Sequence, residues 1–277
     1  MSIDLLYVDF FRFLDQLQKE GDPWPVYQQL YLQPHFDFFK AYWGAFKHFD
    51  EGQIASRVRQ IKKEDYGHLR SLIETEDVAG KTAETLEQCR PVIKLPEDPP
   101  VYLFIGFFSL DGATVEVNGH LSIALGLERF KNFKDLPLLV AHEYCHCAQR
   151  LLQKDLFGGT ERPLLLSIIS EGFAVLFTEL LYPRTPLNRH LFLSPERLQW
   201  CRENREALLD LAGADLASAK LVPILFGQGD PMAGIPPRVG YFVAREMLGH
   251  CLSHHGVGEF KRAFPGFEGL LRKIKKG

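Results

Sequence analysis

The stretch Leu136–Leu152, LPLLVAHEYCHCAQRLL, sets His142, Glu143 and His146 in an otherwise apolar run. Residues four apart lie on the same face of an α-helix, so the two imidazoles can face one metal ion. Glu143 is rotated away from direct ligation but can reach a water molecule held by that metal. The spacing therefore predicts a helix that carries two zinc ligands and a general base.

The residues around this stretch predict where its helix begins and ends. Asp135 can cap the first turn, and Pro137 is tolerated there because the amide at that position has no partner within the helix. The pair Gly158-Gly159 predicts the end of the helix. A second helix is predicted from near Thr160 to just before Pro183.

A catalytic zinc usually has three protein ligands, so one more is needed. Glu171 lies in a strongly apolar helical segment, where binding zinc would compensate a buried carboxylate that is otherwise costly. Glu171 could instead be a helix-surface residue or a partner of Arg150 or Arg162. Glu179, eight residues on and about 80° around the helix, could be the ligand in its place or could hydrogen-bond a ligand histidine.

The segment before the motif helix predicts three short strands. An apolar run covers Val101 to Phe108, a turn follows at Asp111-Gly112, and two alternating segments meet at Asn118-Gly119. Asn-Gly favours a type I′ turn because both positions need a positive φ. We therefore expect a small antiparallel sheet before the motif helix.

The remaining sequence predicts mostly helices, and hence an α+β fold that is largely helical. Residues 1–95 show a helical, aromatic-rich pattern, which ends at the three prolines of Leu95–Pro100. We predict a helical N-terminal region, 1–95, and a second region, 96–277, that carries the motif. Its C-terminal part is also predicted to be helical, with a loop rich in glycine and proline over Gly227–Arg238.

Composition is that of an ordinary globular chain of 277 residues, 46% hydrophobic and 24% charged. A net charge of -3 offers nucleic acid no overall attraction. Asp4 stands where a secretory signal needs a basic region, and the N-terminus predicts an amphipathic helix. Two carboxylates within Leu164–Leu181 favour a buried helix over a membrane span. Five cysteines without a regular framework suit reduced thiols, which favours a cytoplasmic protein.

The segments AHEYCH and ISEGFA together resemble the gluzincin metallopeptidases, in which a HExxH helix is joined by a glutamate from a following helix. The chain looks most like a family of predicted bacterial zinc-dependent proteases of unknown function. The matching elements fall between about Val101 and Gly256: Asn118-Gly119, His142 to His146, Glu171-Gly172 with Ala174, and Gly240-Tyr241.

This resemblance implies a zincin-like fold and a peptidase mechanism. His142, His146 and Glu171 would bind Zn²⁺, which lowers the pKa of its bound water to about 7 and polarises the scissile carbonyl. Glu143 would take the proton of that water and deliver it to the leaving amine. The substrate would be a peptide or protein.

Two further roles follow from the resemblance. Tyr241 is the first candidate for a second donor to the tetrahedral intermediate, with His120 and Arg238 as weaker ones; a half-buried packing role for Tyr241 is the alternative. Zincins align an extended peptide on an edge strand beside the active-site helix, and His120–Leu125 is the candidate for that strand.

Other metal-ligand residues are interpreted more simply. Cys145 and Cys147 lie about 200° apart on a helix, so both cannot face one metal, and small buried thiols are common. His250 and His254 also stand four apart, but no acid lies between them, and a solvated cluster is expected. The basic C-terminus, LLRKIKKG, is expected to be a solvated tail.

The sequence thus favours a zinc-dependent peptidase with Glu143 as the general base, no bound nucleic acid and no membrane span. The alternative is a zinc-stabilised binding or regulatory protein without useful turnover. A third hypothesis is a metal-free protein in which His142, Glu143 and His146 stand together by accident.

Overall fold

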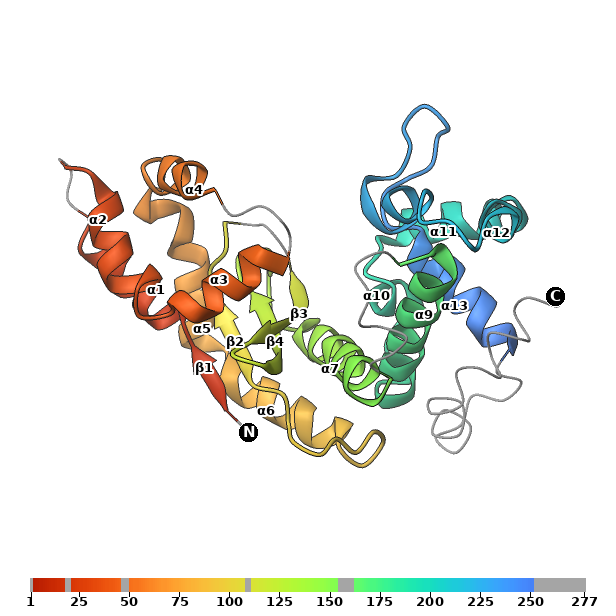
Figure 1. Cartoon of the computed structure of the whole chain (residues 1–277), viewed down its shortest axis with the longest axis horizontal. Coiled ribbons are helices and arrows are strands. Elements are labelled where there is room, and N and C mark those ends of the chain that lie inside the picture. The colour runs from red at the N-terminus through yellow and green to blue at the C-terminus, as the bar shows by residue number, and fades with distance from the viewer. Residues whose placement is uncertain (1, 18–20, 46–49, 108–110, 154–161, 252–277) are drawn as a thin grey trace. The chain divides into compact units, whose positions relative to one another are not determined.

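The computed structural model describes residues 2–17, 21–45, 50–107, 111–153 and 162–251 (Figure 1). The chain divides into two compact units. One contains Met1–Glu87 and Pro96–Cys147, and the other contains Gln88–Leu95 and Ala148–Gly277. The predicted division into domains 1–95 and 96–277 stays a prediction.

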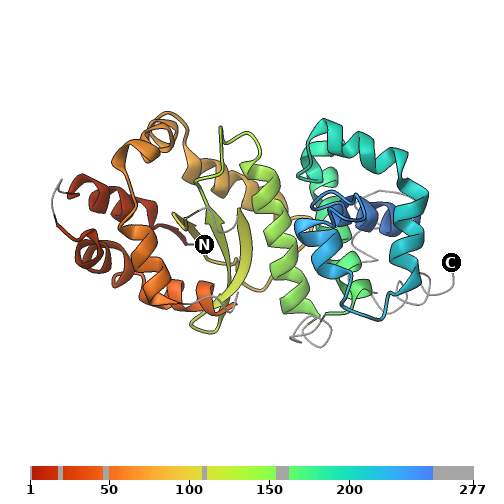
Figure 2. The ribbon, with the colours of Figure 1, turned by 90° about the horizontal axis from the view of Figure 1, so that it is seen from above.

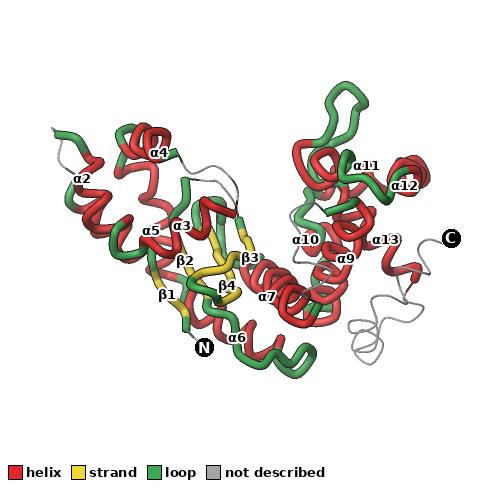
Figure 3. Tube along the Cα trace, viewed as in Figure 1, coloured by secondary structure: helices red, strands yellow, loops and turns green. Residues whose placement is uncertain are grey.

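Helices dominate both units, and the four strands all belong to the first (Figure 3). The first unit begins with strand β1 and is then helical up to β2, in agreement with the aromatic-rich pattern of this region. Its elements are β1 (Ile3–Leu5), α1 (Tyr7–Asp15), α2 (Pro23–Tyr27), the π-helix η1 (Gln28–Leu32), α3 (Phe36–Ala45), α4 (Glu51–Val58), the 3-10 helix η2 (Lys63–Tyr66), α5 (Gly67–Thr75), most of α6 (Val78–Cys89), β2 (Val101–Phe104), β3 (Gly112–Val117), β4 (His120–Gly126) and most of α7 (Leu136–Leu152).

The sheet has the strand order β1-β2-β4-β3 and is mixed. β3 and β4 form the predicted antiparallel hairpin, and both of its turn residues, Asn118 and Gly119, have positive φ. The prediction of an antiparallel sheet is wrong for the rest, because β2 pairs parallel with both β4 and β1. The run of apolar residues in β2 is typical of a parallel strand that is buried on both faces.

The N-terminal segment also differs from its prediction as one helix. Ile3–Leu5 extend alongside β2 as the short strand β1, and helix α1 begins only at Tyr7. The sheet is covered on one side by α7 and on the other by α1 and α3 (Figure 2). Aromatic side chains fill the second layer, where Phe38 and Tyr42 each pack against the Phe104 ring at 4.7–5.0 Å between centroids.

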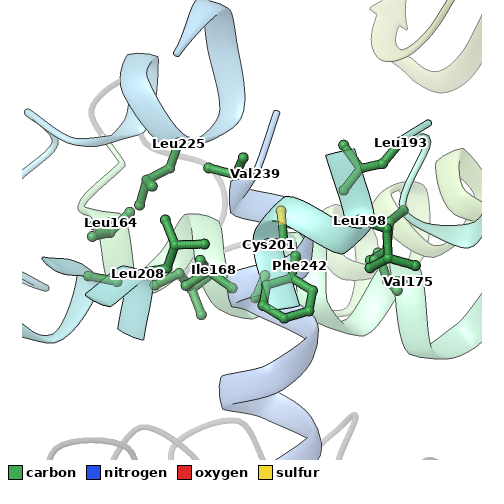
Figure 4. Packing of buried hydrophobic residues seen from close by; sticks show 14 residues of the cluster. Leu164, Ile168, Val175, Leu193, Leu198, Cys201, Leu208, Leu225, Val239 and Phe242 are labelled. Carbon is green, nitrogen blue, oxygen red and sulfur yellow. The ribbon is translucent and has the colours of Figure 1, made fainter. Parts of the chain in front are cut away.

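The second unit consists of helices joined by turns and loops in its described residues, with one isolated β-bridge between Asp230 and Ile235. It contains the last turn of α7, then α9 (Leu164–Leu181), α10 (Leu187–His190), α11 (Pro195–Glu203), α12 (Arg205–Ala214), the π-helix η3 (Pro223–Gln228) and α13 (Gly240–Cys251). Leu164 and Ile168 of α9 share a buried core with Leu208 of α12 and Phe242 of α13 (Figure 4). α9 therefore forms the centre of this unit.

Helix α9 is long and apolar enough to cross a membrane by length and composition alone. In the structure, however, 72% of it is buried within the protein. Burial by other helices is the expected environment of a core helix, as the sequence predicted for Leu164–Leu181. The cellular compartment stays a prediction.

Candidate metal centre

Helix α7 spans Leu136–Leu152 and brings the two histidines of the motif together, as predicted. The Nε2 atoms of His142 and His146 lie 3.0 Å apart, and the ring planes are 86° apart. His142 is only 3% exposed, while His146 is half-buried. Both ring nitrogens thus converge on one point beside the helix.

This separation suits a shared metal ion. Two zinc–nitrogen bonds of about 2.0–2.1 Å at a tetrahedral angle place the nitrogens about 3.3 Å apart. The observed 3.0 Å between the Nε2 atoms of His142 and His146 is close to that value. The pair can therefore accept zinc with a small rotation of either ring.

Glu143, which follows the first histidine, faces strand β3. It is 6% exposed, and the Thr114 hydroxyl donates a hydrogen bond to its Oε2 atom at 3.1 Å. Gly112 lies beside the same side chain, since a Cβ atom there would come within 3.2 Å of Glu143 Cγ and 2.8 Å of Leu139 Cδ1. Neither residue was predicted to belong to the site, because Gly112 was expected in a turn and only the packing of β3 against α7 brings both residues to Glu143.

Helix α9 lies beside the last turn of α7 through a reciprocal pair of hydrogen bonds. The Ser170 hydroxyl donates to Gln149 Oε1 at 2.7 Å, and Gln149 Nε2 donates to the Ser170 carbonyl at 2.9 Å. Gln149 lies three residues beyond His146, about one helical turn. Glu171 follows Ser170 directly, so the main chain that carries the Glu171 side chain is hydrogen-bonded to Gln149 of α7.

The structure contains one possible metal site among the residues that it describes. It consists of His142, His146 and Glu171, each offering one ligand atom, and these atoms lie within 4.8 Å of one another. Two imidazoles and a carboxylate are a donor set that zinc prefers in catalytic sites. The residues present therefore fit the metal that the sequence predicts.

Two arginines share the surroundings of Glu171. Burial lowers the pKa of the Arg162 guanidinium, the nearby positive charge of Arg150 lowers it further, and the Glu171 carboxylate acts in the opposite direction. Glu171 therefore has a cationic neighbour, as the alternative interpretation of this residue required. The two roles are compatible, because a carboxylate has two oxygen atoms and can serve a metal and a cation together.

Glu179, the alternative ligand, has a different partner. Arg245 donates to both of its oxygens, from Nε at 3.0 Å and from Nη2 at 3.2 Å. These bonds raise the pKa of the Arg245 guanidinium. A two-pronged ion pair of this kind compensates the Glu179 carboxylate without a metal.

The glycine after Glu171 lies at a close approach of α9 to α13. A Cβ atom on Gly172 would lie 2.7 Å from the Ala244 carbonyl oxygen, which belongs to the backbone of α13. We predict that Gly172→Ala lowers the free energy of unfolding by about 1–3 kcal/mol, as overpacking typically does. Chemical denaturation measures this change.

The matched control for this glycine is Gly213 in α12. It is exposed, and a Cβ there meets nothing within 4 Å. Gly213→Ala is expected to be neutral or to stabilise by up to about 1 kcal/mol, because alanine favours a helix interior. Equal destabilisation by both substitutions would contradict the close approach at Gly172.

The three candidate donors to the tetrahedral intermediate are placed as follows. Tyr241 is half-buried on α13, where its ring packs edge-on against Phe192 and Phe226, at 6.1 and 5.8 Å between centroids. The Arg238 guanidinium lies over the same ring at 5.4 Å. His120 is exposed at the start of β4. These contacts give Tyr241 a packing role, and its catalytic role stays a prediction.

The strand expected to align a peptide, His120–Leu125, is not at the edge of the sheet. It forms β4, which is hydrogen-bonded to β2 on one side and to β3 on the other. That expectation is therefore wrong for Ile123–Leu125, which pair with both neighbouring strands and leave no main-chain edge for a substrate, whereas the register pairs His120–Ser122 with β3 alone. Among the described strands, β3 is the edge that lies beside the motif helix.

Two buried thiols and His250 were the other metal-ligand residues considered from the sequence. Cys145 and Cys147 are buried, and Cys147 Sγ lies 3.6 Å from the Thr114 hydroxyl. His250 lies in α13, whereas His254 and the basic C-terminus fall outside the described residues. Neither thiol nor His250 belongs to the possible metal site.

Comparison with known families finds a match to one family model. The model of a family with the description "Predicted Zn-dependent protease (DUF2268)" matches residues 83–263, which are 181 of the 277 residues. The matched region contains the hairpin, the motif helix, α9 and α13. No curated protein and no solved structure matches the chain.

Proposed function

Because the chain belongs to the family of predicted Zn-dependent proteases, we propose that it is a gluzincin-type, zincin-like metallopeptidase. His142, His146 and Glu171 would hold the zinc ion, and Glu143 would be the general base. The observation that carries the proposal is the meeting of these two imidazoles and one carboxylate within 4.8 Å. The position of Glu143 on the same helix, next to the first ligand, supports its role.

The roles of the residues follow from their chemistry. Bound zinc would supply a lowered water pKa of about 7 and a polarised scissile carbonyl. Glu143 would accept the proton of the attacking water on one carboxylate oxygen, while the other accepts the hydrogen bond from Thr114. It would then deliver that proton to the leaving amine. Its burial keeps bulk water from competing for the proton.

The substrate would be a peptide or protein in extended conformation. β3 is the edge strand that contacts Glu143, so its main-chain groups are the candidate for pairing with the substrate. Tyr241 remains the candidate for a second donor to the developing oxyanion. The zinc site and the general base do not depend on either assignment.

Metal analysis tests the site before any substrate is known. Purified protein is expected to bind about one zinc per chain, and His142→Ala and His146→Ala should each lose most of it, because two ligands hold zinc poorly. Zinc in excess should also stabilise the folded chain, by about 2.7 kcal/mol at a hundred times Kd. Inductively coupled plasma mass spectrometry and thermal unfolding measure the two effects.

His250→Ala is the control for histidine loss, since His250 lies outside the possible metal site. It should leave the zinc content unchanged. If the two motif variants also keep their zinc, the ion is bound elsewhere and the proposed site is wrong.

A further inference from the structure

Two residues of strand β3 lie against the side chain of Glu143. Gly112 has no side chain there, and the Thr114 hydroxyl donates a hydrogen bond to the carboxylate. We infer that these two residues form a positioning element that holds the Glu143 carboxylate in its working orientation, an inference that rests on the proposed function. Neither residue is a metal ligand or takes part in the proton transfer itself. They would act on the rate through Glu143.

The strand geometry places both residues on the helix side of the sheet. Side chains alternate along a strand, so residues 112 and 114 share one face, while Ala113 and Val115 point to the other and are buried there. α7 lies on the Gly112 face, since Leu139 and Glu143 approach that glycine. The packing of α7 on this face of β3 thus brings Gly112 and Thr114 next to Glu143.

Gly112 leaves room for the aliphatic part of the Glu143 side chain. A Cβ there would lie 2.8 Å from Leu139 Cδ1 and 3.2 Å from Glu143 Cγ, closer than ordinary contacts. Any larger side chain must move one of these two groups. The absence of a side chain at Gly112 therefore leaves room for the Glu143 side chain beside the strand.

The Thr114 hydroxyl hydrogen-bonds the Glu143 carboxylate. Its hydroxyl lies 3.1 Å from Glu143 Oε2, 3.3 Å from the Glu143 carbonyl and 3.6 Å from Cys147 Sγ. A hydroxyl has one proton to donate, and of the two Glu143 oxygens within reach the carboxylate oxygen is the nearer one and the stronger acceptor. The Cys147 thiol, one helical turn after Glu143, can donate to the same hydroxyl, which would keep its proton directed at the carboxylate.

Threonine suits this task better than a flexible residue. Its branched Cβ restricts χ1, so the hydroxyl keeps one direction at little entropic cost. A catalytic carboxylate must be held close to its productive geometry by neighbouring hydrogen bonds. A displacement of about 1 Å can cost about a hundredfold in rate.

Substitution of Thr114 tests this role in the zinc-loaded enzyme. Thr114→Val removes the donor and nearly keeps the shape, and it should lower kcat by about 10- to 100-fold, with KM and zinc content within twofold of the unaltered protein. Thr114→Ser restores a donor and should recover most of the lost kcat. Full activity of Thr114→Val, or equal damage by serine and valine, would overturn the inference.

A second measurement uses the metal-free chain and needs no substrate. Thr114→Val should lower the melting temperature by about 2–4 °C, the usual effect of losing one buried hydrogen bond in a chain of this size. The same substitution made in a Glu143→Ala background should lower the melting temperature by less, because the carboxylate is gone while the main-chain carbonyl of residue 143 still accepts from the hydroxyl. Equal shifts in the two backgrounds would show that the Thr114 hydroxyl and the Glu143 carboxylate do not interact.

The two measurements separate the possible failures. If the effects of Thr114→Val and Glu143→Ala on the melting temperature are coupled but Thr114→Val leaves kcat unchanged, the contact exists without positioning the base. The proposed peptidase function would then stand. If the unaltered zinc-loaded protein cleaves nothing, the proposed function and the positioning role are both wrong.

Gly112→Ala should also lower kcat, because its Cβ would displace Leu139 or Glu143. An unchanged kcat would show that Gly112 does not help to position Glu143.

Discussion

Glu143→Gln is expected to lower kcat for peptide hydrolysis by about a hundred- to ten-thousandfold, the usual contribution of a general base. Glutamine has the same shape but no site that can take a proton from water at neutral pH. His142 and His146 remain in place, so the variant should bind as much zinc as the unaltered protein. Hydrolysis of a fluorogenic peptide library, with zinc measured on the same samples, records both quantities.

Glu206→Gln is the matched control for this loss of charge. Glu206 is an exposed glutamate of α12, and its replacement removes the same charge outside both the motif helix and β3. It should retain normal turnover. Activity that survives in Glu143→Gln would contradict the role of Glu143 as base.

A third outcome would favour the alternative function. If the unaltered protein binds zinc and is stabilised by it, but cleaves no peptide in a broad library, a zinc-stabilised binding or regulatory protein becomes the better account. Glu143→Gln would then leave both zinc binding and any partner binding unchanged. Metal content and turnover must therefore be measured together.

Local chemistry was enough to predict several elements from the sequence. Asn118-Gly119 supplies the positive φ values that the hairpin turn needs. The apolar run at Leu136–Leu152 forms one helix, as its spacing of apolar and polar residues predicts. Each of these signals depends on residues only a few positions apart.

Features that depend on distant pairing were not predictable in the same way. Ile3–Leu5 become a strand only because β2, nearly a hundred positions later, offers a partner. The parallel pairing of β2 with β4 likewise depends on where the hairpin folds back. The Gly112–Thr114 face could be recognised only once β3 was placed against α7. Such contacts are set by tertiary packing, which local propensity does not encode.

Two glutamates on one helix show the same limit within the site. Glu171 and Glu179 are both acids in the apolar helix α9, and helical spacing alone does not say which of them a metal would bind. The difference comes from other elements. Gln149 of α7 hydrogen-bonds Ser170, the neighbour of Glu171, whereas Arg245 of α13 takes both oxygens of Glu179.

Glu171→Gln is therefore expected to weaken zinc binding by at least about a hundredfold, more than is usual for a group that only supports a ligand. A neutral amide oxygen is a much poorer zinc ligand than a carboxylate, while the shape of the side chain stays the same. Competition with a chromophoric chelator measures the affinity without any substrate. This loss should appear whether or not the protein is an active peptidase.

Glu179→Gln is the matched control, an identical change eight residues along the same helix. It should keep the affinity for zinc and instead weaken the link between α9 and α13, because Arg245 loses the negative charge and one of the two acceptor oxygens of its partner. The cost in stability should be modest, since Arg245 is partly exposed and also donates to Glu246 at 3.0 Å. If the control loses zinc while Glu171→Gln keeps it, Glu179 is the third ligand, and the ion pair with Arg245 must give way when the metal binds.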